Sequence, residues 1–225
     1  MDLEIKRALK NYLFEFLSDN KRTLFEKNIE NRTRHLTVVL EDIYQPHNAS
    51  AVLRSSDLFG VQDIHIIENK NQYNINPDVV VGSNKWLNLF QYNQLENNTL
   101  QCIDKLRSEG YIIAATTPYN KDINLEDMPV HHKTAFLFGT ELTGLSEIAL
   151  ENSDVFVKIP MYGFTESFNI SVSAALTMYS FSQRMRRNNI LWQLTEEEKL
   201  DILIQWSKNT IKEVDLIIKR FMDSV

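Results

Sequence analysis

The sequence predicts an α/β fold, in which a mainly parallel sheet carries helices on both faces. Short apolar runs typical of buried strands alternate along the chain with stretches of helical periodicity. Successive parallel strands need a connection long enough to return to the starting edge of the sheet, and a helix meets that need. Hydrophobic residues make up 43% of the 225 residues, so the chain can build one sizeable core.

Five apolar runs are expected to form the strands of the sheet. Each is short, rich in aliphatic or aromatic residues, and bounded by polar residues or glycine. They cover residues 35–40, 61–67, 111–116, 134–138 and 154–159.

The remaining segments include several helical patterns. Gly60 and Gly110 lie where two of the helices are expected to end, and Asn48 suits the N-cap of the first of these two. Thr195 and Glu198 have the spacing of a capping box. The expected helices cover residues 3–26 (one or two helices), 48–59, 99–108, 145–150, 171–187 and a C-terminal region from residue 195.

The expected organisation is one main domain with terminal extensions. Residues 1–34 form an N-terminal helical extension, residues 35–188 the α/β domain, and residues 189–225 a C-terminal helical extension. No apolar run approaches the roughly 20 residues that span a bilayer, and no secretory signal is recognised at the N-terminus. A single cysteine, Cys102, is interpreted as a packing residue. The cytoplasm is the expected compartment.

Glycine and histidine spacing excludes several kinds of site. The six glycines are isolated, so neither a G-x-G-x-x-G dinucleotide motif nor a P-loop can form. The five histidines lack a spacing typical of zinc ligands, and no metal is expected. No G-x-S-x-G sequence supports a hydrolase.

A first polar segment, residues 46–60, is expected to form a helix after the first strand. Ser50, Arg54 and Asp57 recur on one helical face as a polar stripe. Arg54 is therefore a candidate functional residue. A surface arginine beside Asp57 is the simpler interpretation of this pattern taken alone.

Two later segments follow strands and enter loops. In residues 136–146 a buried strand leads into a glycine-bounded turn, which carries Glu141 at the sheet edge where ligands of open α/β sheets bind. A glutamate that caps the next helix is the alternative. Residues 159–173 carry hydroxyl and amide side chains suited to a ligand with polar edges, such as adenine. Helix capping by Ser167 or Asn169 explains the same residues.

Taken in this order, the three segments resemble the signature motifs of the SpoU/TrmH family of ribose methyltransferases, in the SPOUT class. The matching patterns are N-x-x-x-x-x-R-x-x-x-x-F-G, F-G-x-E-x-x-G-L and I-P-M-x-G-x-x-x-S-x-N-x-S-V, within residues 36–187. The resemblance implies a C-terminal trefoil knot, S-adenosylmethionine as cofactor, and a homodimer. Knots are rare exceptions to chain topology, so no periodicity predicts one.

The resemblance also assigns roles by position. Arg54 corresponds to the family's essential arginine and Asn48 to the asparagine that helps to position it. The polar positions of the later motifs are Glu141, Ser167 and Asn169. The positions that hold the cofactor, largely through backbone groups, are Thr116, Leu137, Gly139, Ile159, Met161 and Phe168. Phe168 replaces the usual leucine, so we expect altered packing around adenine.

Within the family, the overall plan is similar to the subgroup that methylates the ribose of guanosine 18 in the tRNA D-loop. Ribosomal RNA or another tRNA position is the alternative substrate. An inactive RNA-binding module and a nucleotide-binding α/β protein unrelated to RNA are alternatives from other classes. The net charge is −6, so a tRNA is expected on a local basic surface. Besides basic residues near the N-terminus, the expected RNA contacts are His47, Arg34, Arg184, Arg186 and Arg187; solvated charge on helices is the alternative.

Arginine is an unusual candidate for a base, because its guanidinium stays protonated at neutral pH. Our hypothesis is that Arg54 lies against a substrate phosphate. The phosphate then takes up its proton transiently, or the guanidinium stabilises the developing alkoxide. Asn48 and Glu141 are expected to orient it.

Overall fold

The computed structural model describes residues 1–74, 76–118 and 123–223, and the chain divides into two compact units. The first unit combines both ends of the chain, Met1–Thr33 and Gln193–Val225. The second unit is the continuous segment Arg34–Trp192, which contains all three polar segments singled out above.

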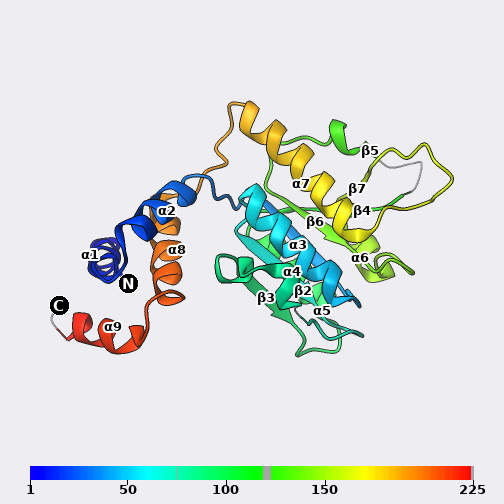
Figure 1. The fold of residues 1–225 in the computed structure, drawn as a ribbon. Helices are drawn as coiled ribbons and strands as arrows, with labels where there is room; N and C mark the ends of the chain where they lie inside the picture. The colour runs from blue at the N-terminus through cyan, green and yellow to red at the C-terminus, as the bar shows by residue number, and fades with distance from the viewer. Residues whose placement is uncertain (75, 119–122, 224–225) are drawn as a thin grey trace. The chain divides into compact units, whose positions relative to one another are not determined.

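The second unit is built on a parallel sheet (Figure 1). Among the described residues, seven strands lie in the order β3-β2-β1-β6-β4-β7-β5, and every neighbouring pair is parallel. The strands are β1 (Leu36–Glu41), β2 (Asp63–Ile67), β3 (Asn88–Tyr92), β4 (Ile112–Thr116), β5 (Ile123–Asn124), β6 (Thr134–Phe138) and β7 (Val155–Lys158). The five predicted strands are confirmed, with ends that differ by at most two residues.

Two strands, β3 and β5, were not predicted from the sequence. Both lie at the edges of the sheet. β3 reads Asn-Leu-Phe-Gln-Tyr and is mostly half-buried, so it lacks a continuous apolar run. β5 is two residues long, too short for any periodicity to reveal.

Helices cover both faces of the sheet, as predicted. Phe136 and Leu137 are neighbours in β6 and point to opposite faces, because side chains alternate along a strand. Phe136 packs with Phe181 of α7, and Leu137 lies in the same buried cluster as Leu106 of α5. The helical segments of this unit are α3 (Pro46–Phe59), α4 (Pro77–Val80), η1 (Ser83–Lys85), α5 (Asn98–Ser108), η2 (Leu125–Asp127), α6 (Glu147–Glu151) and α7 (Ile170–Arg187).

The start of α3 differs from the prediction in a way that matters for the site. Its N-cap is Gln45, which makes no side-chain cap bond, and proline occupies the first turn. The expected N-cap role of Asn48 is therefore wrong, and its amide can bond elsewhere. Ser50, expected on a polar stripe with Arg54 and Asp57, is buried and accepts a backbone N–H at 2.8 Å. Gly60 ends the helix in the left-handed region, at φ 79°, as predicted.

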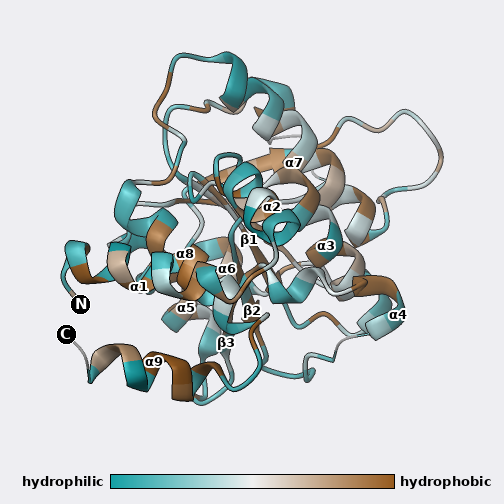
Figure 2. Ribbon diagram, turned by 60° about the vertical axis from the view of Figure 1, so that its left-hand side comes forward, coloured by the Kyte–Doolittle hydropathy of each residue, from teal (hydrophilic) through white to brown (hydrophobic). Residues whose placement is uncertain are grey.

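The first unit is helical throughout its regular structure. Its helices are α1 (Leu3–Glu15), α2 (Asp19–Ile29), α8 (Glu196–Lys208) and α9 (Val214–Met222). Leu9, Leu13, Ile204 and Phe221 form a small buried core, to which α9 presents the apolar residues coloured brown in Figure 2. The predicted capping box at Thr195 is confirmed. No helix in the described ranges is long and apolar enough to cross a membrane.

The basic residues near the N-terminus are largely paired with acids of the same unit. Lys6 lies 2.8 Å from both Glu197 and Asp201, and Arg7 lies 2.7 Å from Glu196. Lys10 similarly faces a glutamate of α2 at 3.6 Å. These cations are thus partly neutralised, which weakens the expectation of an N-terminal basic surface for RNA.

Candidate functional site

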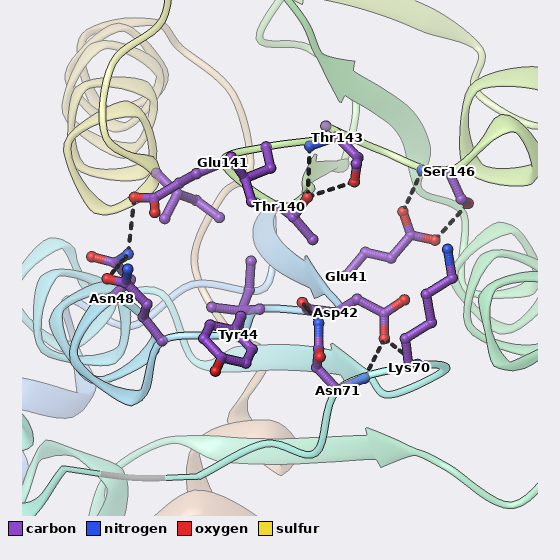
Figure 3. A pocket seen from close by; sticks show the side chains of 15 residues that line it. Glu41, Asp42, Tyr44, Asn48, Lys70, Asn71, Thr140, Glu141, Thr143 and Ser146 are labelled. Carbon is purple, nitrogen blue, oxygen red and sulfur yellow. Dashed lines mark hydrogen bonds between the residues drawn. The ribbon is translucent and has the colours of Figure 1, made fainter.

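One residue from each of the three polar segments meets in a single cluster. Asn48 of α3 donates from Nδ2 to Glu141 Oε1 at 2.9 Å, and Asn169 donates from Nδ2 to the same oxygen at 2.6 Å. Asn169 Nδ2 also lies 3.2 Å from Asn48 Oδ1. Figure 3 shows Glu141 reaching from its turn toward Asn48. Segments far apart in sequence are thereby joined through one carboxylate oxygen.

A closed turn after β6 presents Glu141. Thr140 and Gly144 exchange two backbone hydrogen bonds of 3.0 Å. A Cβ at Gly139 would lie 2.2 Å from the carbonyl carbon and oxygen of Gly144, so only glycine fits there. The alternative that Glu141 caps the next helix is wrong, because Ser146 caps α6.

Asn169 has two functions at once. Its Oδ1 accepts from the backbone N–H of Ser171 at 2.9 Å and from the Ser171 hydroxyl at 2.6 Å, which makes it the N-cap of α7. Its Nδ2 is left to donate to Glu141. The capping interpretation is therefore correct for Asn169, and the cap fixes the orientation in which its amide enters the cluster.

Ser167 and Arg54 lie outside this cluster. Both are exposed, and neither side chain makes a hydrogen bond or ion pair within the part of the chain that the structure describes. Arg54 follows Asn48 by six residues on α3, so the two side chains point about 120° apart around the helix. Its guanidinium is thus open to a partner from outside the described chain.

The expected cofactor positions gather at one edge of the sheet. Thr116, Gly139 and Ile159 lie at or after the carboxyl ends of β4, β6 and β7, which are neighbours in the order β6-β4-β7. Thr116 Oγ1 donates to the Leu137 carbonyl at 2.7 Å. The other two expected positions, Met161 and Phe168, lie in the long loop that follows β7, and Phe168 is 39% exposed.

Three of the five expected RNA contacts have structural partners. Arg34 pairs with Asp63 at 2.9 Å. Arg184 donates to the carbonyls of Leu125 and Met128, and burial lowers the pKa of its guanidinium. These bonds tie α7 to η2, and their loss would free backbone carbonyls.

Arg186 is also held within its own unit. Its guanidinium lies 4.3 Å from the centre of the Trp192 ring, and burial lowers its pKa. Solvated surface charge is therefore the wrong interpretation for this arginine. By contrast, His47 and Arg187 are exposed and remain the expected RNA contacts that are open to solvent.

A cavity of about 580 Å³ adjoins the cluster. Asn48 and Glu141 form part of its wall, and the rest includes Asp42, Tyr44 and Lys70 (Figure 3). The sequence reasoning missed these last residues, although an acidic pair directly after the first strand was a usable signal. No group of three or more possible metal ligands is found among the described residues.

Glu41, the other half of this acidic pair, is structural. It is buried, and its Oε1 accepts from the hydroxyls of Thr99 at 2.6 Å and Ser146 at 2.8 Å. Its Oε2 accepts from the Ser146 backbone at 2.8 Å. Glu41 thereby holds the start of α5 and of α6 against β1.

The chain resembles known proteins both in sequence and in fold. Residues 35–179 match the SpoU rRNA Methylase family. The tRNA (guanosine(18)-2'-O)-methyltransferase of Borreliella burgdorferi is 45% identical over 217 residues, which cover 96% of this chain and 97% of that one.

Two solved structures extend the comparison. The TrmH/SpoU tRNA modifying enzyme of A. aeolicus aligns with a TM-score of 0.76 and 28% identity, over 86% of this chain and 98% of that one. The SpoU methyltransferase AviRb of Streptomyces viridochromogenes, solved with AdoMet, shares the fold at a TM-score of 0.61 and 22% identity, over 72% of this chain and 62% of that one. The extent of the family match and the 45% identical relative show that this chain belongs to the SpoU rRNA methylase family.

Proposed function

We propose that this protein transfers a methyl group from S-adenosylmethionine to the ribose 2′-hydroxyl of guanosine 18 in the D-loop of tRNA, in the cytoplasm. The observation that carries the proposal is the joining of Asn48, Glu141 and Asn169 in one cluster. The tRNA and the position follow the B. burgdorferi relative, which matches 96% of the chain.

The residues that follow β7 suit this cofactor. Ile159, Met161 and Phe168 offer partly exposed apolar surface for an adenine ring. Between them, residues 161–167 make no backbone hydrogen bond within the described ranges, so their N–H and C=O groups are free for a polar ligand. When bound, S-adenosylmethionine supplies a methyl group attached to a positively charged sulfur.

The residues of the chain then have to orient the ribose and assist the loss of the proton from its 2′-hydroxyl. The Glu141 carboxylate bonds the amides of Asn48 and Asn169. These bonds fix the positions of α3, the loop after β6 and the start of α7 relative to one another. The exposed guanidinium of Arg54 is free to contact a substrate phosphate and to stabilise the oxygen as its proton leaves. Ser167, exposed in the same loop as Asn169, is proposed as a further polar contact.

A homodimer is part of the proposal. Val172, Leu176 and Tyr179 recur at helical spacing along α7 and are 43%, 38% and 55% exposed. Leu58 of the adjacent α3 is 75% exposed. A second copy that covers this apolar face would also bring another Arg54 close to the interface. Sedimentation of the purified chain at twice its monomer mass is the expected result.

A trefoil knot is also proposed. β6 is inserted between β1 and β4, while β7 lies beyond β4. From there the chain returns to pack α7 against α3. Such a return across strands already in place, together with the similarity to TrmH/SpoU structures, supports a knotted path. We retain 1–34, 35–188 and 189–225 as the proposed functional division of the chain.

Ribosomal RNA is the second candidate substrate, because the family description names it. Incubating the full chain and S-adenosylmethionine with unmodified tRNA and ribosomal RNA, followed by mapping of 2′-O-methyl groups, distinguishes the two. We expect one modified ribose, at guanosine 18 of tRNA. Modification of ribosomal RNA alone contradicts the tRNA assignment, and no modification of either RNA contradicts the enzymatic one.

A further inference from the structure

The wall of the cavity beside the cluster includes a carboxylate that uses only one of its two oxygens in hydrogen bonds among the described residues. Asp42 follows β1 and is 8% exposed. Its Oδ1 accepts three backbone N–H groups, from Asn69 at 2.7 Å, Lys70 at 2.7 Å and Asn71 at 3.2 Å. Its Oδ2 has no hydrogen-bond partner in the described part of the chain, and Figure 3 shows it on the side away from these bonds.

The backbone at this position is strained, which fixes the carboxylate further. Asp42 has φ 54°, in the left-handed region that side chains rarely adopt. Such strain persists where the surroundings determine the conformation, and here three backbone amides do so. The free oxygen is thus held in one place and not left to rotate in solvent.

A cation and an aromatic ring complete the cavity. Lys70 is exposed and makes no ion pair among the described residues, although its own backbone N–H is bonded to Asp42. Figure 3 shows its side chain rising along the side of the cavity that Glu41 and Ser146 form. Tyr44 lines the same cavity and is 77% exposed.

We propose that this cavity recognises the guanine base of the target nucleotide, an inference that rests on the proposed function. Asp42 Oδ2 accepts from the N1–H and N2–H groups of the base, Lys70 donates to its O6, and Tyr44 stacks on its face. Bases of unpaired RNA loops are read through such stacking and through their Watson–Crick edges. Because Asn48 and Glu141 belong to the same wall, a base in this cavity places its ribose at the cluster.

The same arrangement selects against adenine. Adenine presents an acceptor, N1, where guanine presents a donor, and an amino group where guanine has O6. Its N1 would face the Asp42 carboxylate and its amino group the Lys70 ammonium, so both charged groups would lose their hydrogen bonds. A site that hydrogen-bonds a polar group of its substrate discriminates strongly against an analogue without that group, because the polar groups of the site are then left unpaired.

The test is kcat/KM for tRNA transcripts that carry guanosine or adenosine at the target position. We expect Lys70→Met to lower kcat/KM on guanosine about 10- to 100-fold and to change it less than about twofold on adenosine. Asp42→Asn keeps an oxygen for the three backbone N–H groups but presents an NH₂ to the base. It should therefore lose activity on guanosine and gain activity on adenosine. The exposed residues Lys212 and Asp104 provide matched controls, Lys212→Met and Asp104→Asn, which should leave both values unchanged.

Calorimetry separates this inference from the proposed function. The wild-type chain should bind guanosine monophosphate in preference to adenosine monophosphate, and Lys70→Met should reduce the preference, because only the discrimination by Asp42 remains. If no RNA is methylated, the proposed function fails while this binding preference still supports the guanine cavity. Equal binding of the two nucleotides by the wild type, or equal losses on guanosine and adenosine in the Lys70→Met variant, overturns the inference.

Discussion

One carboxylate oxygen of Glu141 accepts hydrogen bonds from two side-chain amides, so each partner has to be a hydrogen-bond donor. Asn48 and Asn169 both meet this need, because each donates from its Nδ2 to the Glu141 oxygen. A carboxylate in place of either amide would set two negative charges at hydrogen-bond distance. Such pairs raise a carboxyl pKa, because one group must keep a proton to avoid repulsion.

Asn48→Asp is predicted to destabilise the fold in a pH-dependent way. The folded pair would bind more protons than the unfolded chain above about pH 4, so stability falls as pH rises from there through the raised pKa of the folded pair. We expect a loss of about 1–3 kcal/mol at pH 7, partly regained toward pH 5. Urea unfolding at both pH values measures it.

The double variant Asn48→Asp with Glu141→Gln is the control for Asn48→Asp. It restores one carboxylate and one amide with their positions exchanged, so most of the lost stability should return. Equal stability of Asn48→Asp at pH 5 and pH 7, or no recovery in the double variant, contradicts the role of charge in the cluster.

The residues of the cluster were singled out from the sequence, whereas those of the guanine cavity were missed. Asn48, Glu141 and Asn169 stand at fixed spacings within recognisable motifs, although local patterns alone offered helix capping as an interpretation of each. Asp42 and Lys70 resemble ordinary polar loop residues. Their juxtaposition depends on the pairing of β1 with β2, which no local pattern reports.

At the scale of elements, the turn between Gly139 and Gly144 determines where Glu141 points. Gly139→Ala is predicted to destabilise the protein by more than about 2 kcal/mol, because the added Cβ would lie 2.2 Å from the backbone of Gly144. Gly163→Ala is the matched control, since its nearest contact would be 4.0 Å away. Thermal melting should show a lower Tm for the first variant alone; equal melting temperatures would contradict the crowding at this turn.

The elements themselves were predictable where burial is continuous. All five apolar runs became strands because their side chains fill two buried clusters, one on each face of the sheet. The edge strands β3 and β5 were missed because edge positions need no apolar run. The N-cap of α3 was misplaced because proline and Gln45 start the helix before the more typical capping residue.

At the scale of the whole molecule, a buried histidine should make stability sensitive to acid. His65 of β2 is stacked on Phe90, and its Nδ1 lies 2.8 Å from the Tyr92 hydroxyl. Burial, together with the charge of Lys105, lowers its pKa to about 3. The unfolded chain binds a proton at His65 below about pH 6.5 while the folded one does not. The stabilising contribution of His65 is therefore complete above that pH and is lost as pH falls.

We expect His65 to account for about 2 kcal/mol of stability lost between pH 7 and pH 5. The variant His65→Phe should show a correspondingly smaller decrease over this range, whatever its stability at pH 7. His131→Gln, at an exposed position, should retain the wild-type decrease. Identical pH dependence in the wild type and His65→Phe would show that His65 is not held neutral in the folded state.

Whole-molecule features were the least accessible from patterns in the sequence. The joining of both chain ends in one helical unit depends on packing between α1 and α8, far apart in sequence. Only the family resemblance suggested the proposed knot and the proposed homodimer beforehand. Arg54 is also a feature of the whole molecule, because its guanidinium is exposed and makes no hydrogen bond or ion pair within the described chain.

The rate of methyl transfer from S-adenosylmethionine to unmodified tRNA in a single turnover, compared between wild type and Arg54→Ala, examines the role of this guanidinium in the reaction. We expect a loss of about 100-fold or more, with unchanged melting temperature and unchanged affinity for S-adenosylmethionine. A wild-type rate in a folded, cofactor-binding Arg54→Ala variant would contradict the proposed chemistry.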